Sequence, residues 1–314
     1  MKTLFITCLF IVYSTVFSLK SVAQPDTLSF LHITDLHLIF NPDLHQQDLA
    51  QSRKHYAQGQ TPLKQFLQTM PEKTNSSMVI ATGDLVDSYE TEAKDGKMVS
   101  FPADQFMRVV GKSKVPVYLT LGNHDISSYT WENNARRSNQ NNTGQSRARW
   151  IRNIPCFKNG TYYSQIHQVG KTTYRLIFLD NGFYRFLPGE NVSVPYIDKP
   201  QVYWLMTQLQ QSNNDIEIIL MHLPLTTAAT QPESSNEIYP VLAKNPSAKL
   251  ILAGHNHKNA MQDFASGEDK KMVQVQTGAF AQDKENWRVI RLTENAILVS
   301  VPGNTKNELT IPVN

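Results

Sequence analysis

Short apolar runs recur along this 314-residue chain, and polar or amphipathic stretches separate them. Runs bounded by Gly and polar residues are typical of buried strands, whereas apolar residues at i, i+3, i+4 and i+7 are typical of helices. The alternation predicts an α/β arrangement of packed layers. The expected helices are 61–70, 103–110 and 201–211, and the expected strands are 28–34, 77–82, 115–121, 174–180, 216–221, 249–253, 272–277, 287–292 and 296–301.

Gly, Asp, Asn and His stand directly after five of these runs. The five blocks are Asp35-Leu36-His37, Gly83-Asp84-Leu85-Val86-Asp87, Gly122-Asn123-His124-Asp125, His222 and Gly254-His255-Asn256-His257. Open α/β sheets collect their ligand sites at the carboxyl ends of the strands. We therefore expect the five blocks to meet at one edge of the fold.

The side chains in these blocks are carboxylates, imidazoles and one amide, which suit hard to borderline divalent metals. They are more numerous than one ion needs, so the pattern predicts two ions that share a bridging carboxylate. Two ions about 3.5–4 Å apart hold a phosphoryl group from both sides and generate hydroxide at neutral pH. Cys8 and Cys156 are the only cysteines, which excludes a disulfide framework and a thiolate metal site.

The order D-x-H, G-D-x-x-D, G-N-H-D, H and G-H-x-H resembles the calcineurin-like metallophosphoesterase family, from Asp35 to His257. The resemblance implies a four-layer αββα sandwich: two mixed β-sheets flanked by helices, with metals at the carboxyl ends of the strands. It also implies two divalent or mixed-valence ions, of Mn, Fe or Zn. The residues that match the family's metal ligands are Asp35, His37 and His257 for one ion, Asp84 as the bridge, and Asn123, His222 and His255 for the other.

The resemblance assigns a catalytic role to the G-N-H-D block as well. His124 matches a histidine that is not a ligand but touches the phosphate and helps the leaving group to depart, and Asp125 is expected to orient it. Asp87 is interpreted as structural or as a support for a ligand. Tyr89 follows Asp87 and Ser88, so the additional tyrosine ligand of purple acid phosphatases is not supported. The glycines of the blocks are expected to permit sharp turns at the strand ends: Gly83, Gly122 and Gly254.

Residues outside the blocks leave alternatives open. The histidines without motif partners are expected to be structural or on the surface, with His45 the best exception because it follows His37: His32, His45, His55 and His167. A polar insertion at about 127–160 holds five arginines: Arg136, Arg137, Arg147, Arg149 and Arg152. The set is expected to form the solvated face of a short helix, and one member is expected to bind substrate phosphate. Tyr129, Trp131 and 183–186 form either an apolar wall of the site or part of the core.

The amino-terminal residues 1–23 have the pattern of a signal peptide: a positive charge at Lys2, an apolar stretch, and small residues before a cut after Ala23. An uncleaved anchor or a buried strand is the alternative. Cleavage removes two of the 30 basic residues and none of the 27 acidic ones, which leaves 24–314 with a net charge of +1. Because nucleic-acid binders carry a strong basic excess, we expect no stable nucleic-acid complex. Membrane contact is expected only through an uncleaved signal.

These features together predict an exported, periplasmic or secreted, phosphoesterase domain at 24–314. A metal-bridging hydroxide would attack phosphorus in line. Phosphodiesters are slightly favoured over monoesters because L-H-I-T-D-L-H and G-H-N-H resemble the branch that contains cyclic-nucleotide phosphodiesterases. The expected substrates are nucleotides, phospholipid head groups or other small phosphoesters. A non-catalytic envelope binding protein that retains the fold is the alternative.

Overall fold

The computed structural model describes residues 26–45, 53–133, 135–186, 193–212, 214–225, 237–266 and 270–313. The predicted signal peptide at 1–23 lies outside these residues. Within the described part of the chain, no helix is both long enough and apolar enough to cross a membrane.

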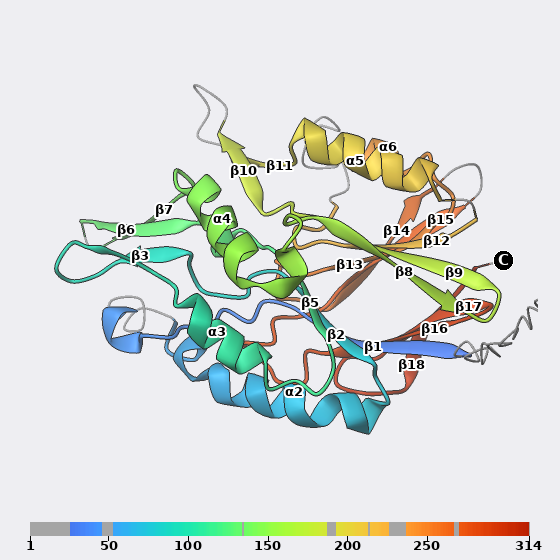
Figure 1. Ribbon diagram of the computed structural model, residues 1–314, viewed down its shortest axis with the longest axis horizontal. Coiled ribbons are helices and arrows are strands. Elements are labelled where there is room, and N and C mark those ends of the chain that lie inside the picture. Colours follow the sequence, from blue (N-terminus) through green and yellow to red (C-terminus); the bar gives the residue numbers. More distant parts are fainter. Residues whose placement is uncertain are drawn as a thin grey trace, which may run out of the picture.

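Two six-stranded mixed sheets face each other (Figure 1). The first sheet has the order β18 (Asn307–Pro312), β17 (Ala296–Ser300), β16 (Arg288–Thr293), β1 (Thr27–Ile33), β2 (Met78–Thr82) and β5 (Val117–Thr120). The second has the order β14 (Ala260–Ala265), β15 (Lys271–Gln276), β13 (Ala248–Ala253), β12 (Ile216–Leu220), β9 (Thr172–Phe178) and β8 (Tyr163–Val169). Strands β1, β2 and β5 run parallel, as do β9, β12, β13 and β15.

Helices cover the outer faces of both sheets, which produces the four predicted layers. The helices beside the first sheet are α2 (Gln60–Thr74), α3 (Ala103–Val110) and α4 (Thr143–Asn153), and those on the second are α5 (Lys199–Gln210) and α6 (Tyr239–Leu242). One buried cluster joins the inner faces of the two sheets, and it includes Phe30 and Ile218. A second cluster packs Leu63 and Trp150 against the first sheet, and a third packs Leu205 against the second.

Local sequence explains where these helices begin and end. The carboxylate of Asp198 caps α5 by accepting a hydrogen bond from the backbone N–H of Gln201 at 2.9 Å, and Pro200 occupies the first turn. Helix α2 buries Leu63, Phe66 and Leu67 on one face, and the residue that follows it, Asn75, adopts the left-handed conformation. The periodicity that predicted these helices therefore reflects the face that each buries.

Smaller elements lie outside the two main sheets. They are a four-stranded sheet in the order β4 (Met98–Ser100), β3 (Glu90–Glu92), β6 (Ser128–Glu132) and β7 (Ala135–Asn139), and the hairpin β10 (Phe183–Phe186) with β11 (Ser193–Tyr196). The short 3-10 helices are η1 (Pro42–His45), η3 (Tyr56–Gln58), η4 (His124–Ile126) and η5 (Pro155–Phe157). The polar insertion expected at 127–160 thus forms β6, β7, α4 and η5.

Candidate metal centre

Left-handed backbone is concentrated where the chain leaves the main strands. Five block residues have positive φ: Asp35 (53°), His37 (43°), Asp84 (49°), His255 (72°) and His257 (56°). Residues other than glycine rarely adopt this conformation, which costs about 1–3 kcal/mol each and is found mainly at functional sites. The remaining described positions with positive φ, glycines aside, are all asparagines, which tolerate it well. The strain therefore marks one site.

Asp35 shows how each carboxylate is oriented. Its Oδ2 accepts hydrogen bonds from Thr34 Oγ1 at 2.9 Å and from the backbone N–H of His255 at 3.0 Å. Its Oδ1 is buried without a hydrogen-bond partner among the described residues and lies 3.2 Å from His257 Nε2. One oxygen is therefore held by the fold, and the other is left to face the centre.

Asp84 occupies the middle of the centre. Its Oδ1 accepts from the backbone N–H of His124 at 2.9 Å, and its Oδ2 lies 3.2 Å from His222 Nε2 and 3.7 Å from His37 Nε2. His222 Nδ1 lies 2.8 Å from Thr82 O, which makes Nδ1 the donor and turns Nε2 toward Asp84. Burial lowers the pKa of His222, but the charge of Asp84 outweighs it and raises that pKa to about 9. A metal ion at Nε2 would displace this proton.

Two groups of side chains share Asp84, and each is close enough to hold an ion. The first contains Asp35, His37, Asp84 and His257, and the second contains Asp84, His222 and His255. In the first group, His37 Nε2 and His257 Nε2 are 3.1 Å apart. Two imidazole nitrogens bound at about 2.1 Å to one ion, at a right angle, would be about 3.0 Å apart. The donor set and its spacing therefore fit a cation.

Asn123 is a further candidate ligand. Its Oδ1 is buried and has no hydrogen-bond partner among the described residues. A buried acceptor without a hydrogen-bond partner is costly, and a bound ion is one of its ordinary explanations. Of the seven side chains that the sequence selected as metal ligands, six thus lie in the two groups, and Asn123 offers a buried oxygen without a hydrogen-bond partner.

Two different structural requirements explain the glycines of the blocks. Gly83 adopts φ +82°, which fits the predicted sharp turn. Gly122 and Gly254 do not have positive φ, so left-handed backbone is not what requires glycine there. A Cβ on Gly122 would lie 2.3 Å from Asp84 N, and one on Gly254 would lie 2.5 Å from Asp35 Oδ2. These two glycines permit the close approach of neighbouring blocks.

His124 lies beside the first group, but its support differs from the expectation. Its Nδ1 is 2.8 Å from Asp87 O, and its ring meets the His37 ring edge-on at 4.7 Å. Asp125 uses its two oxygens to accept from Val86 N at 2.9 Å and Gly122 N at 2.7 Å. The expected orienting role of Asp125 is therefore replaced by the carbonyl of Asp87, while Asp125 ties two blocks together.

Asp87 also supports a ligand through its side chain, as one of its two predicted interpretations required. Its Oδ1 lies 3.4 Å from His37 Nδ1, and Arg53 and Arg136 both form ion pairs with its carboxylate. Arg136 also lies over the Tyr129 ring at 3.3 Å. Arg136 is the member of the arginine set that reaches the centre.

The other arginines of the set have contacts elsewhere. Arg137 pairs with exposed Glu132, Arg147 with buried Asp180, and Arg149 donates to the carbonyl of Phe101. Arg152 is exposed on α4. Most of the set is therefore structural or solvated.

Several contacts of the centre come from residues that the sequence did not single out for this role. Tyr56 stacks on the His37 ring at 4.7 Å, and Gln282 Nε2 lies 2.8 Å from His257 Nδ1. Arg53 was also missed. No motif marks these residues, because they meet the blocks only through the tertiary fold.

Two further tyrosines approach the centre with their hydroxyl groups. Tyr129 Oη lies 3.0 Å from His124 Nδ1, and Tyr184 Oη lies 3.2 Å from His255 Nε2. Of the open interpretations for the aromatic residues, these contacts favour a wall of the site for Tyr129 and Tyr184. Phe183 instead lies under the guanidinium of Arg147 at 3.9 Å.

Of the four histidines without motif partners, the three whose side chains the structure describes belong to neither metal group. His32 is fully buried between Thr277 Oγ1 at 2.9 Å and Thr82 Oγ1 at 2.8 Å, which confirms a structural role. His55 packs edge-on against Tyr56, and His167 lies on β8 beside Gln165. The side chain of His45 lies outside the described part of the structure.

Comparison with known proteins agrees with this geometry. Residues 28–259 match the family model described as calcineurin-like phosphoesterase. A dimetal phosphatase from Danio rerio is 15% identical with a TM-score of 0.64, over 93% of this chain and 100% of that chain. A purple acid phosphatase from yellow lupin (Lupinus luteus) seeds is 15% identical with a TM-score of 0.54, over 92% of this chain and 54% of that one.

A third structure has a different description. GAP50, the anchor in the inner membrane complex of Plasmodium, is 15% identical with a TM-score of 0.50, over 92% of this chain and 89% of that one. At these identities the structural likeness shows the fold alone. A search of curated protein sequences finds no significant match.

Proposed function

The chain belongs to the calcineurin-like phosphoesterase family, and from this premise we propose that it hydrolyses small phosphoesters at two metal ions. The observation that carries the proposal is the position of Asp84, whose carboxylate belongs to both groups of candidate ligands. One ion, of Mn, Fe or Zn, would be held by the residues that surround Asp35, and the other by those that surround His222. The proposed ligands are Asp35, His37, Asp84 and His257 for the first, and Asp84, Asn123, His222 and His255 for the second.

A metal pair at this position supplies charge neutralisation for phosphoryl oxygens and activation of water at neutral pH. The chain supplies the geometry. Asp87 O accepts the proton on His124 Nδ1, which leaves Nε2 as the nitrogen available to a leaving oxygen. Burial lowers the pKa of His124 to about 3, and the negative charge of a bound phosphoester would raise it again.

Within this class we propose phosphodiesters ahead of monoesters, on the resemblance of the first and last blocks to the cyclic-nucleotide phosphodiesterase branch. Nucleotides and phospholipid head groups are the substrates to test first. Export to a periplasmic or extracellular space is proposed from the composition of residues 1–23 alone.

The test begins with the metal-stripped chain, which should hydrolyse neither an aryl phosphate nor a bis-aryl phosphodiester until Mn²⁺ is restored. Asp84→Asn should abolish turnover, and His124→Ala should lower kcat by about 10²–10⁴ while both metals stay bound. Asp263→Asn, at an exposed carboxylate that pairs with Lys271, is the matched control. Loss of both metals from His124→Ala would contradict its role as a residue that does not bind metal.

A non-catalytic binding protein is the second candidate, because this fold also occurs in the Plasmodium protein described as an anchor. Metal analysis separates the candidates. About two metals per chain, with hydrolysis of either substrate, supports the enzyme. A chain that takes up no metal after careful reloading supports the binding protein.

A further inference from the structure

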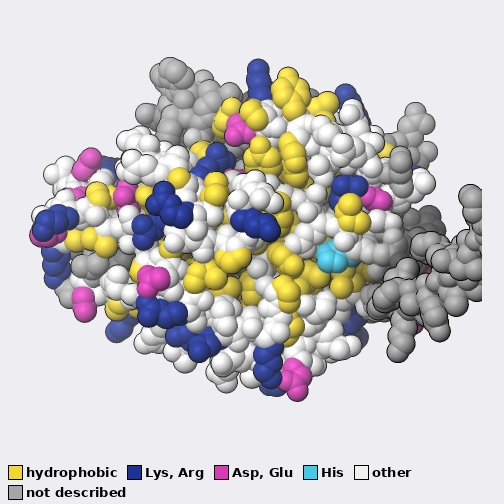
Figure 2. All heavy atoms as spheres, viewed as in Figure 1, with side chains coloured by type: hydrophobic (Ala, Val, Ile, Leu, Met, Phe, Trp, Pro, Cys, Tyr) yellow, Lys and Arg dark blue, Asp and Glu magenta, His cyan; other side chains and the backbone are white. Residues whose placement is uncertain are grey.

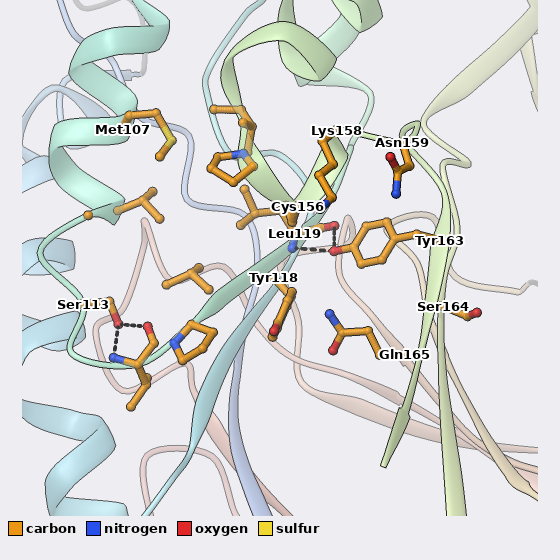
Figure 3. A pocket seen from close by; sticks show the side chains of 17 residues that line it. Met107, Ser113, Tyr118, Leu119, Cys156, Lys158, Asn159, Tyr163, Ser164 and Gln165 are labelled. Carbon is orange, nitrogen blue, oxygen red and sulfur yellow. Dashed lines mark hydrogen bonds between the residues drawn. The ribbon is translucent and has the colours of Figure 1, made fainter. Parts of the chain in front are cut away.

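The open side of the sandwich carries an apolar groove that takes no part in the proposed hydrolysis. It lies where β5, at the edge of the first sheet, faces β8, at the edge of the second, and its volume is about 580 Å³ (Figure 3). Met107 and Val110 line it from α3, and Ile154 and Pro155 line it from the segment at η5. Known small-molecule sites span about 300–1,000 Å³ and are mostly apolar. No candidate metal ligand lines this groove.

Hydroxyl groups satisfy the backbone of two residues at this edge. Ser113 Oγ accepts from Val115 N at 3.3 Å and donates to Val115 O at 2.7 Å. Tyr163 Oη accepts from Leu119 N at 3.2 Å and donates to Leu119 O at 2.9 Å (Figure 3). An added peptide strand gains its affinity from free N–H and C=O groups along an edge. The groove therefore offers hydrocarbon surface to a ligand and little of the hydrogen bonding that a strand requires.

The charge at the groove favours an anion. Lys158 is the one charged side chain among the described residues that line it, and it is exposed to solvent. No carboxylate is among those lining residues. The neighbouring Asn159 adds a polar amide at the same end (Figure 3). Figure 2 shows hydrophobic side chains gathered on this face of the molecule.

From these observations we propose that the groove binds the acyl chain of an anionic amphiphile, with the acidic head at Lys158. The apolar walls exclude water from the chain, and the ammonium group at the mouth pairs with the head. A free fatty acid and a lysophospholipid with an anionic head share this chemistry. The site is independent of the metal centre, so it holds whether or not the protein is an enzyme.

The thiol of Cys156 can report whether a ligand occupies the groove. Cys156 lines it and is partly buried, and it is the free cysteine of the described residues. Burial raises the pKa of its thiol to about 11, so its alkylation is slow and depends on access. An acyl chain in the groove would cover the sulfur and slow alkylation further.

The experiment measures alkylation of Cys156 in the full chain by peptide mass spectrometry, below the critical micelle concentration of each probe. Dodecanoate should slow alkylation at least tenfold, whereas dodecylamine and inorganic phosphate should not. Lyso-phosphatidic acid, used as a second probe, distinguishes a lipid head group from a free fatty acid as the source. Protection by either anionic amphiphile supports the proposal.

Variants test where the acidic head and the acyl chain of the ligand bind. Lys158→Ala should weaken dodecanoate binding about tenfold by calorimetry, whereas Lys112→Ala should not, since Lys112 is exposed nearby but does not line the groove. Val117→Phe should fill the groove and remove binding, while metal content and circular dichroism show that the variant is folded. Equal protection by dodecylamine, equal effects of the two lysine variants, or no protection by any anionic amphiphile would overturn the proposal.

Discussion

Tyr184 tests how the metal centre is supported from outside the main sheets. Its hydroxyl lies 3.2 Å from His255 Nε2, and it comes from the β10–β11 hairpin. Gln140 fixes this segment, because its Oε1 accepts from Tyr184 N at 3.0 Å and its Nε2 donates to Gly182 O at 3.2 Å. Burial raises the pKa of Tyr184, so the hydroxyl stays protonated across any practical assay range.

Tyr184→Phe removes this hydroxyl and leaves the ring. Partners of this kind hold a ligating histidine in one tautomer and orientation, and their loss costs about 10–100-fold in metal affinity. That range corresponds to about 1.4–2.8 kcal/mol of binding free energy. Tyr184 contacts His255 alone among the candidate ligands. We therefore expect the Mn²⁺ affinity of the site that contains His255 to fall and that of the other site to stay unchanged.

The assay is competition between the metal-stripped chain and a chelating dye during Mn²⁺ titration. Tyr203→Phe is the matched control, because Tyr203 is 64% exposed on α5. Two unchanged affinities in Tyr184→Phe would refute the supporting role. An equal fall at both sites would show instead that the variant disturbs the whole centre.

Three further predictions concern stability. Gly122→Ala should destabilise the fold by about 1–3 kcal/mol in urea unfolding, because the new Cβ would meet Asp84 N at 2.3 Å, whereas Gly144→Ala meets nothing within 4 Å and should not. Burial lowers the pKa of His32 to about 3, so His32 takes up a proton more readily in the unfolded chain than in the folded one. The free energy of unfolding should therefore fall by about 1.4 kcal/mol per pH unit as the pH drops from about 6.5 toward 3. Urea titrations at pH 7 and pH 5 should show this slope, and His32→Gln should reduce it. Chelation should lower the melting temperature, and a metal at 1,000 times its Kd should restore about 4 kcal/mol of the free energy of unfolding. An unchanged melting temperature would argue against a bound ion.

Much of the sandwich was predictable because its buried strands have continuous apolar sequences. The expected strands at 28–34, 77–82 and 216–221 correspond to β1, β2 and β12, each of which is buried over most or all of its length. Strands β14 and β18 escaped prediction because most of their residues are exposed, so their sequences show no apolar run. Strand β7 consists of Ala-Arg-Arg-Ser-Asn, which has no strand pattern at all. Such strands exist because a neighbouring strand supplies their hydrogen bonds.

The candidate ligands were determined by the sequence itself, because each of the five blocks follows its own strand and parallel strands end at a common edge. Their supports were decided only by the tertiary structure. Tyr184 and His255 are 71 positions apart, and His255 N reaches Asp35 Oδ2 across 220 positions. Asp125 illustrates the difference, since the family resemblance implied a contact with His124, whereas its carboxylate accepts hydrogen bonds from the backbone of Val86 and Gly122. A motif shows which residues follow a strand together. The orientation of their side chains depends on backbone and side-chain groups that only folding brings within hydrogen-bonding distance.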